Sequence, residues 1–403
     1  RYLIFKFVRK VNSFQQMNYR KFQADKIFTG FEFLDPGHVL IMDVEGKVKE
    51  IVAEMDAGDG IERYRGIICP GFINAHCHLE LSHLKNSIPP HTGLIPFLLD
   101  VVSKRDHDQS LILDCIENAE KEMELEGIVA VGDICNTSIT LQSKCNSKIK
   151  WNNFIEVLGM KDEKAEANLL HYEGILDVFN GAATNMKSSL VPHAPYSISN
   201  KTFEGINNRT GHSIVSMHSQ ENPAEDELYA KGTGDFIRLF NKLGLAESPF
   251  PVSGKSSLQS CLPYFNKQQR IILVHNTFTA AEDIVFALDH AKEHLSGVHF
   301  CICANANRYI ENQMPPIDLL MKHKAEIVLG TDSYSSNWQL SIAAEIRTIR
   351  KELPEIPLQC ILQWATINGA RALERDDALG SFEPGKKPGI VLLDNALQAK
   401  KII

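Results

Sequence analysis

Two histidines, His76 and His78, stand two positions apart at the end of an apolar segment rich in β-forming residues. Side chains at positions i and i+2 of a strand point to the same face, so both imidazoles can reach one metal ion while Cys77 points away. An H-x-H pair alone is weak support for a metal site, because short motifs recur by chance. Its weight depends on what stands at the ends of the other strands.

Further residues that bind metals or carry protons end other apolar segments of the chain. These residues are His193, His218, His275 and Asp332. A single histidine is more often structural than a ligand, but a series of such residues at the carboxyl ends of apolar strands is typical of a barrel enzyme. Imidazole and carboxylate groups together suit Zn²⁺, with Fe²⁺ as the alternative. We therefore expect a site for a divalent metal.

The elements that position these residues follow a repeating pattern. Eight β-rich segments, each followed by a stretch long enough for a helix, are typical of βα units. The segments are Ile68–Leu81, Ile128–Ile134, Asn153–Leu158, Ser188–Tyr196, Ser213–Gln220, Arg270–Asn276, Gly297–Ala304 and Glu326–Asp332. Helices are expected in the connections, among them Leu111–Glu126, Phe236–Leu243, Ala280–Leu295 and Ile317–Lys324. The pattern predicts an α/β fold with a (β/α)₈ TIM-like barrel over residues 68–370.

The two ends of the chain have a different pattern. Residues 22–65 hold short alternating runs separated by turns, and the tail holds a strand, GIVLLDN, after the turn EPGKKPG. We expect residues 1–67 and 371–403 to pair into a small β-sandwich domain. Residues 1–16 are apolar and basic without a small-residue cleavage site, so we expect an extension ahead of a start at Met17 rather than a signal peptide.

Composition excludes several classes of partner. The net charge of −8 supplies no basic surplus for nucleic acid or an anionic membrane. No apolar run approaches the roughly 18–20 residues that span a bilayer. The odd number of cysteines, 9, without a short-spaced framework favours reduced thiols and a cytoplasmic location. A homodimer is left open.

Several motifs, in type and in order, resemble those of the amidohydrolase superfamily. They are PGFINAHCHLELS, PHAPYS, MHSQE, LVHNT and GTDSYSSN, followed by a closing segment, ATINGARALERDDALGSFEPGKKPGIVLLD. The similar branch holds cytosine, guanine and S-adenosylhomocysteine/methylthioadenosine deaminases and atrazine-type chlorohydrolases. The resemblance covers the chain from about Phe22 onward. CANAN departs from the commoner CPxSN form, and GKKPGIVLLD departs from the usual GKxAD, which affects the sandwich and not the chemistry.

The resemblance implies a role for each site residue. It implies His76, His78, His218 and Asp332 as the ligands of a single metal. Glu221 matches the carboxylate that shuttles a proton to the substrate ring, and His275 matches the histidine that assists at the tetrahedral centre. Asp332 would also take a proton from the attacking water. Binuclear members carry a lysine at the fourth strand end, where this chain reads VPHAPYS, so one metal per chain is expected, Zn²⁺ first.

The resemblance also implies a heterocyclic small-molecule substrate and a hydrolytic deamination. We expect an adenine-type nucleoside (S-adenosylhomocysteine, methylthioadenosine or aminofutalosine-like), with guanine, pterin or triazine rings as alternatives. HLELSHL resembles aminofutalosine deaminases. His193 matches a substrate-contacting histidine, and Glu80 either contacts substrate or pairs structurally with a loop. The loop Ser82–Gly93 is expected to cover the site.

Three rival interpretations remain to be weighed. His78-Leu79-Glu80 fits half of the cytidine-deaminase zinc signature, but no P-C-x-x-C follows. His290 to His294 fits the H-x-x-E-H pattern of zinc peptidases, but it lies in an expected outer helix. A non-catalytic metal-binding barrel is the alternative of another class. A non-catalytic barrel would lack a metal ligand or the proton-shuttling glutamate. This chain retains all the ligand positions and the glutamate.

Overall fold

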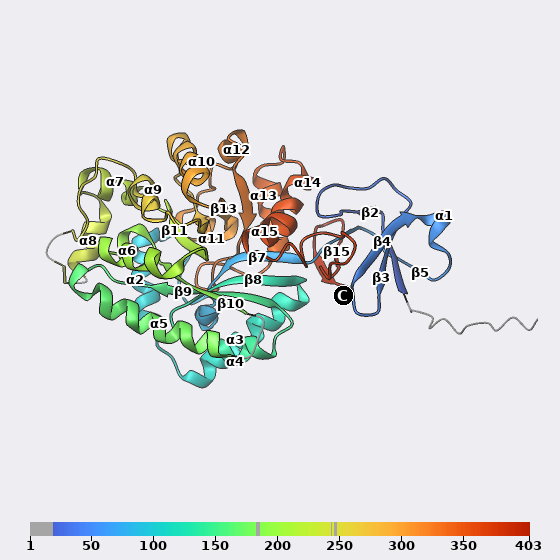
Figure 1. Ribbon diagram of the computed structural model, residues 1–403, viewed down its shortest axis with the longest axis horizontal. Coiled ribbons are helices and arrows are strands. Elements are labelled where there is room, and N and C mark those ends of the chain that lie inside the picture. Colours follow the sequence, from blue (N-terminus) through green and yellow to red (C-terminus); the bar gives the residue numbers. More distant parts are fainter. Residues whose placement is uncertain (1–18, 183–185, 243, 246–247) are drawn as a thin grey trace, which may run out of the picture.

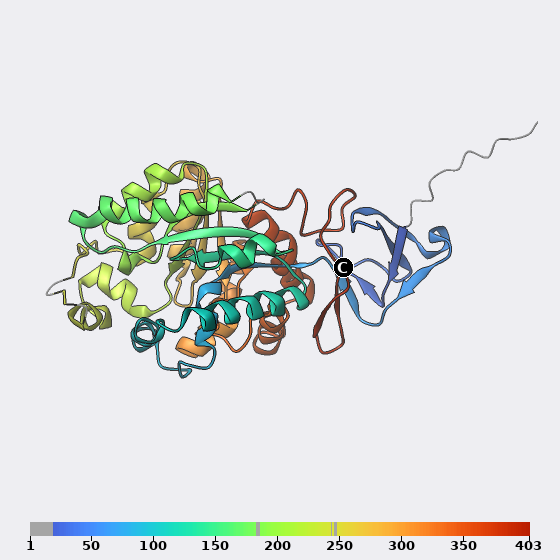
Figure 2. The ribbon, with the colours of Figure 1, turned by 90° about the horizontal axis from the view of Figure 1, so that it is seen from below.

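The computed structural model describes residues 19–182, 186–242, 244–245 and 248–403. It has a large α/β part and a small part made of short strands, which lie side by side along the long axis (Figure 1). The view turned by 90° shows the same division, with the C-terminus at the junction (Figure 2). The extension expected over residues 1–16, and the last residue of the helix expected over Phe236–Leu243, lie outside the described residues.

The large part contains one strand for each of the eight expected segments. The strands are β7 (Phe72–Cys77), β8 (Ile128–Cys135), β9 (Lys150–Val157), β10 (Lys187–Pro192), β11 (Ile214–Ser219), β12 (Arg270–His275), β13 (Gly297–Ile302) and β14 (Glu326–Leu329). They pair in parallel in two four-stranded sheets, β10-β9-β8-β7 and β11-β12-β13-β14. Nearly all their residues are buried, as expected for apolar strands covered on both faces.

Backbone hydrogen bonds link the two sheets at both seams. The His218 N–H donates to the His193 carbonyl (2.9 Å), joining the ends of β11 and β10. The N–H groups of Thr331 and Asp332 donate to the His76 carbonyl (3.0 and 3.1 Å), joining the segment after β14 to β7. The carboxyl ends of all eight strands therefore lie at one edge of the fold, where parallel α/β enzymes carry their sites.

Helices cover the outside of these sheets (Figure 1). They are α2 (Leu94–Lys104), α3 (Gln109–Leu125), α4 (Leu141–Asn146), α5 (Ala165–Gly181), α6 (Asn200–Thr210), α7 (Pro223–Lys231), α8 (Asp235–Lys242), α9 (Ser257–Cys261), α10 (Ala281–His294), α11 (Ala304–Glu311), α12 (Ile317–Lys322), α13 (Ile342–Glu352), α14 (Leu358–Gln363) and α15 (Gly369–Ala372). None of the helices in the described residues has the length and apolar character needed to cross a membrane.

The prediction of one continuous strand over Ile68–Leu81 is wrong. This segment divides into β6 (Ile67–Cys69), the strand β7 of the large part, and a 3₁₀ helix over Leu79–Leu84. Pro70 lacks the N–H that a continuous ladder needs, and Gly71 packs so tightly that a Cβ there would lie 2.6 Å from the Pro388 carbonyl oxygen. The break transfers β6 to the small part, and leaves β7 in the large one.

The small part is built from both ends of the chain. One sheet has the order β4-β3-β1-β5 and the other β16-β15-β6-β2. Their strands are β1 (Tyr19–Gln23), β2 (Lys26–Ile27), β3 (His38–Asp43), β4 (Val48–Ala53), β5 (Ile61–Arg63), β6, β15 (Val391–Leu393) and β16 (Ala399–Lys401), with the short helix α1 (Glu54–Ala57) after β4. Phe22, Leu40 and Ile68 belong to one buried hydrophobic cluster, to which both sheets contribute residues.

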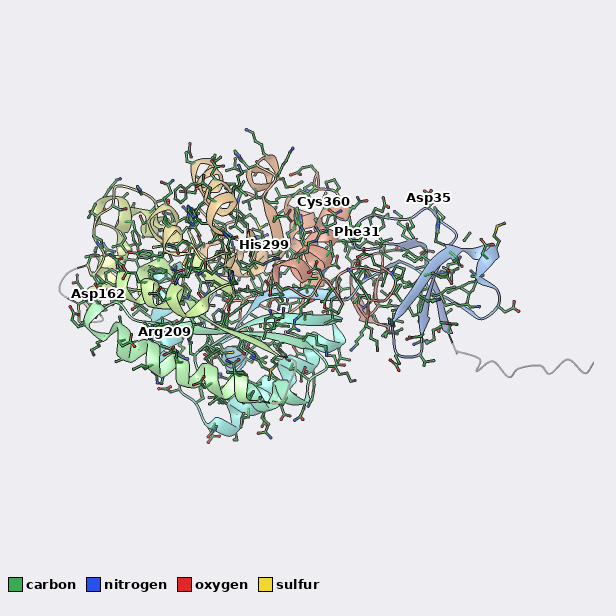
Figure 3. All side chains as sticks on the ribbon, viewed as in Figure 1. Phe31, Asp35, Asp162, Arg209, His299 and Cys360 are labelled. Atoms are coloured by element: carbon green, nitrogen blue, oxygen red, sulfur yellow. The ribbon has the colours of Figure 1, made fainter. Side chains whose placement is uncertain are left out.

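Phe31 lies at the junction of the two parts (Figure 3). Its carbonyl accepts a hydrogen bond from the Gln363 side chain (2.5 Å), and the Arg371 guanidinium lies 5.9 Å from its ring centroid. These contacts hold the small part against the end of the fold opposite the carboxyl ends of the strands.

Candidate active site

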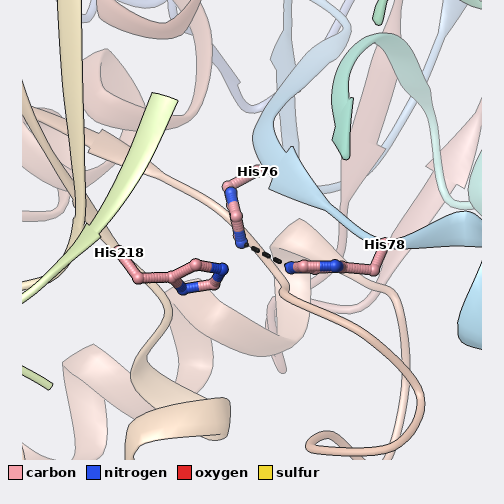
Figure 4. A group of neighbouring side chains, drawn as sticks. All are labelled: His76, His78 and His218. Carbon is pink, nitrogen blue, oxygen red and sulfur yellow. Dashed lines mark hydrogen bonds between the residues drawn. The ribbon is translucent and has the colours of Figure 1, made fainter. Parts of the chain in front are cut away.

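Three imidazoles from the ends of β7 and β11 point toward one another (Figure 4). The Nε2 atoms of His76 and His78 lie 3.1 Å apart. Oδ1 of Asp332, which follows β14, lies 3.6 Å from His76 Nε2 and 3.3 Å from His78 Nε2. The ligand atoms of His76, His78 and His218 lie within 4.8 Å of one another, so the four expected ligands converge on one buried point.

The strand ladder is irregular beside the first two histidines. The pairing of β7 with β8 shifts register between Asn74 and Cys77, near the carboxyl end of β7. The His76 carbonyl instead accepts hydrogen bonds from the N–H groups of Thr331 and Asp332. The two imidazoles nevertheless lie close together, although His78 lies just beyond the end of β7 at Cys77.

Three residues at the site have positive φ angles, which residues other than glycine rarely adopt. His275, Asp332 and Gln220 have φ angles of 75°, 56° and 47°. Non-glycine residues in this region carry strain of roughly 1–3 kcal/mol, and such residues cluster at functional sites. Here the strained positions follow or end β12, β14 and β11, where each chain turns sharply out of its strand.

The protonation states of this cluster suit a metal. Burial lowers the pKa of His78 to about 3 and that of His218 well below its ordinary value, so both rings are neutral near pH 7 and keep a lone pair. Burial alone would raise the pKa of Asp332, but its hydrogen bond with His76 and the neighbouring His78 lower it below its ordinary value. The site therefore combines neutral imidazoles with an ionised carboxylate.

Several buried polar atoms around this point have no hydrogen-bond partner among the described residues. They include both ring nitrogens of His218, Nε2 of His275 and Oε1 of Glu156. Leaving such atoms unsatisfied is costly, and a bound cation would satisfy the nitrogens that face the cluster. The imidazole nitrogens and the carboxylate oxygen of this cluster, whose lone pairs have too few hydrogen-bond donors, fit a divalent metal.

Glu221 and His275 face each other beside the cluster. Glu221 Oε1 lies 3.6 Å from His275 Nε2, and Glu221 Oε2 lies 4.0 Å from His218 Nδ1. Burial, then the charge of Asp332, raises the pKa of Glu221 well above its ordinary value. Glu225, fully buried, accepts the Glu221 N–H (2.8 Å) and so fixes the turn that carries it. Glu221 is therefore a positioned group that holds a proton readily.

A hydrogen bond selects the tautomer of His275. The Asn307 amide donates to the His275 carbonyl (3.2 Å) and to Thr277 Oγ1 (2.8 Å), so its oxygen accepts from His275 Nδ1 (2.9 Å). Burial lowers the pKa of His275, and the neutral ring thus carries its proton on Nδ1. The Nε2 lone pair is left facing Glu221.

A cavity of about 760 Å³, partly open to solvent, lies above these residues. Its floor includes His78, His218, His275, Glu221 and Asp332. One wall is apolar and comes mainly from α2, through Leu94, Phe97, Leu98, Val101 and Val102. The mixture of an apolar wall with a few polar groups is usual for small-molecule sites.

The two expected substrate contacts occupy different places. His193 lines the cavity, and its Nδ1 is bonded to Ser197 Oγ (2.8 Å). Glu80 is absent from the lining, and its Oε2 accepts the backbone N–H groups of Asn136 and Thr137 (3.1 and 3.2 Å). This placement favours the structural alternative for Glu80, and its contact with substrate stays a prediction.

The expected covering loop is tied down on one side of the cavity. Within Ser82–Gly93, the His91 N–H donates to the Tyr309 carbonyl (2.5 Å), and Ile88 is buried. The loop does not contribute to the cavity lining, which α2 supplies instead. The H-x-x-E-H sequence lies on α10, where His290 Nε2 is 2.8 Å from the Phe265 carbonyl oxygen, so it forms no part of this site.

Sequence reasoning missed Glu156, a carboxyl group that lines the cavity. It stands near the end of β9, is 3% exposed, and its Oε1 lies 3.7 Å from His218 Nε2. Asn136 donates to its other oxygen (2.9 Å), and burial raises its pKa to about 7. The available signal was a single acidic residue within the apolar run NFIEVL, which a strand buried on both faces does not otherwise tolerate.

Comparisons with known proteins agree with this geometry. The profile described as the amidohydrolase family matches residues 67–402. An aminodeoxyfutalosine deaminase of a Nitratiruptor species is 27% identical over 342 residues, which are 81% of this chain and 79% of that protein. A 5-methylthioadenosine/S-adenosylhomocysteine deaminase of Thermoanaerobacter pseudethanolicus is 25% identical over 390 residues, 87% of this chain and 79% of that protein.

A solved structure has the same fold. The crystal structure of Helicobacter pylori aminofutalosine deaminase in complex with methylthio-coformycin superposes with a TM-score of 0.78 at 22% identity. The match covers 93% of this chain and 92% of that one. The family match extends over most of the sequence and includes every site residue described above. The chain belongs to the amidohydrolase family.

Proposed function

We propose that this hydrolase is a metal-dependent aminohydrolase that replaces an amino group on an aromatic heterocycle with oxygen and releases ammonia. The observation that carries the proposal is the position of Glu221, a protonatable carboxyl group 3.6 Å from His275 Nε2 at the floor of the cavity. A non-catalytic barrel would have no need of this acid beside a metal site. Water and the amino compound are consumed, and the oxygenated ring and ammonia are formed.

We assign the metal to His76, His78, His218 and Asp332, as one Zn²⁺ per chain with Fe²⁺ as the alternative. Three imidazoles and one carboxylate are ligands that Zn²⁺ prefers. When bound, the metal lowers the pKa of a water molecule and so supplies a nucleophile near neutral pH. Asp332 Oδ2 accepts a hydrogen bond from Ser336, which orients its carboxylate.

The remaining residues move protons. Glu221 donates a proton to the ring nitrogen next to the amino-bearing carbon, which makes that carbon more electrophilic. His275 Nε2, with its lone pair, accepts a hydrogen bond from the attacking water, and once protonated it stabilises the negative charge that develops on the oxygen. Asp332 takes up the second proton of the water, which leaves with ammonia. His275 returns its proton to Glu221, whose Oε1 lies 3.6 Å from His275 Nε2, so that both groups are restored.

The substrate class that we favour is an adenine-type nucleoside. The relatives are named as deaminases of such compounds, and the cavity has room for a ring at its polar floor and a substituent along α2. Guanine, pterin or triazine rings are the second candidates, because chlorohydrolases and a guanine deaminase share the fold. Hydrogen bonds across both seams support a closed (β/α)₈ barrel, and the common core of the two small sheets supports a β-sandwich.

A substrate screen tests the proposal. Purified zinc-loaded protein is incubated with methylthioadenosine, S-adenosylhomocysteine, aminodeoxyfutalosine, guanine, a pterin and an aminotriazine, and ammonia is measured. We expect release of one ammonia per molecule from at least one adenine nucleoside and least from the triazine. The Glu221→Gln variant, purified in parallel, controls for contaminating deaminases. Ammonia release from none of the six, or equal release by the variant, would contradict the proposal.

A further inference from the structure

A buried ion pair lies behind the metal ligands. The Lys144 ammonium of α4 and the Asp133 carboxylate of β8 are 2.5 Å apart, and both side chains are 0% exposed. Lys144 also donates to Asn153 Oδ1 (2.8 Å) and to Cys135 Sγ (3.2 Å). The Trp151 ring centroid lies 5.1 Å from its Nζ. The pair is thus held on several sides, although neither residue lines the cavity.

Stability does not explain this pair. Desolvating two charges costs about as much as their attraction returns, and buried pairs are often replaced by apolar residues without loss of stability. Burial alone would lower the pKa of Lys144, but the charge of Asp133 raises it above its ordinary value, so the ammonium stays charged. A charged pair retained in the core therefore calls for a second role.

The other oxygen of Asp133 indicates that role. Oδ1 accepts the backbone N–H of Leu79 at 2.7 Å, and Leu79 directly follows His78. The β7–β8 pairing shifts register between Asn74 and Cys77, so regular backbone pairing is interrupted beside the assigned ligands. The Asp133 side chain supplies an anchor just beyond this interruption.

We infer that Asp133 is a positioning residue for the metal site: it fixes the backbone after His78, and Lys144 fixes Asp133. The carboxylate has one oxygen on Leu79 and the other on Lys144, so it cannot rotate without breaking one bond. On the other side of His78, Cys77 pairs with Asp332 in an isolated parallel bridge. Without Asp133 as the hydrogen-bond acceptor for the Leu79 N–H, the backbone after His78 is no longer fixed, and the His78 imidazole moves away from the other ligands.

Paired variants separate positioning from stability. Asp133→Asn with Lys144→Met (D133N/K144M) removes both charges and keeps an oxygen for the Leu79 N–H. Asp133→Leu with Lys144→Met (D133L/K144M) also removes both charges, but it removes the acceptor as well. Lys144→Met alone keeps the acceptor and leaves an uncompensated charge. Each chain is checked for cooperative thermal unfolding, and its affinity for Zn²⁺ is measured by competition with a chromogenic chelator.

We expect D133N/K144M to bind Zn²⁺ nearly as tightly as the unaltered chain, and D133L/K144M to bind it about tenfold to hundredfold more weakly, the usual effect of losing a group that orients a ligand. K144M should unfold at a lower temperature and bind Zn²⁺ only slightly more weakly, because its Asp133 carboxylate keeps the Leu79 N–H but loses the partner that stops it rotating. Wild-type affinity in folded D133L/K144M would overturn the inference, as would equal weakening in K144M. If D133L/K144M does not fold, Asp133→Ala with Lys144→Met removes the same acceptor and is judged by the same criterion. The inference rests on the proposed metal site, and an unaltered chain that bound no Zn²⁺ would overturn both.

Discussion

At the scale of single residues, the chemistry depends on two kinds of buried group with opposite shifts. Burial keeps the imidazoles of His78 and His218 neutral, so their lone pairs are available to a cation. The same burial raises the pKa of Glu221, so this carboxyl group can carry a proton. One buried environment thus provides both candidate ligands and an acid, so it separates the roles of these titratable groups.

Glu221→Gln tests the proton shuttle. Glutamine keeps the size of the side chain and cannot exchange a proton, so kcat should fall by about 10²-fold or more, the usual contribution of a positioned acid–base group. The metal content, measured by elemental analysis, should not change, because Glu221 is not among the assigned ligands. Turnover near that of the unaltered chain would move the shuttle to another residue.

Two substitutions, His275→Ala and His218→Ala, test which histidine binds the metal and which acts only in the reaction. His275 is fixed by Asn307 through its Nδ1, and it is not among the four assigned ligands. His275→Ala should therefore retain most of its metal and lose roughly 10²–10³-fold in kcat, the scale for one preorganised stabilising group. His218→Ala should lose metal and activity together. A metal-free His275→Ala protein beside a metal-loaded His218→Ala protein would reverse the assignment.

The site residues differ in how far the sequence alone could reveal them. The ligand positions were predictable, because each polar residue ends an apolar strand. The partners Asn307 and Glu225 were not, because each acts on a residue far away or across a turn, through contacts that only the packed fold creates. Glu156 was accessible in principle, as the acidic residue in a buried strand.

At the scale of elements, the structure assigns the wall of the cavity to α2 rather than to the loop before it. Turn-forming residues in Ser82–Gly93 predicted a cover, but the loop is held to α11 by backbone hydrogen bonds such as Gly93 N–H to the Ile310 carbonyl (3.0 Å). Glu311 at the end of α11 accepts from the Leu94 N–H (2.7 Å) and from the Asn222 side chain (2.8 Å). The start of α2 is therefore linked to the turn that carries Glu221.

A charge on the inner face of α2 tests this assignment. Val101 lines the cavity, and Ser103 on the same helix is exposed. Val101→Asp should raise KM for the best substrate about tenfold or more with a smaller change in kcat, because it weakens binding to an apolar wall away from the reacting atoms. Ser103→Asp is the matched control and should leave both constants unchanged. Equal effects of the two substitutions on KM would show that α2 does not contact the substrate.

At the scale of the whole molecule, the number and order of the strands followed from the sequence, because continuous apolar runs between helical stretches leave few other arrangements. The origin of the small part in both chain ends also followed from the alternating runs there. The division of Ile68–Leu81 did not. Pro70 and Gly71 mark the break in the sequence, but the packing of Gly71 against Pro388 and the pairing of β6 with β15 show that β6 belongs to the other sheet.

Reconstitution with metal tests the central claim most directly, that one divalent cation at this cluster makes the chain a deaminase. The protein is stripped with a chelator, Zn²⁺ is added in substoichiometric steps, and bound metal and ammonia release are measured at each step with the best adenine nucleoside. The account predicts no turnover by the stripped chain and activity that rises in proportion to zinc and levels off at one equivalent per chain. Full turnover by the metal-free chain, or activity that needs two equivalents, would contradict it.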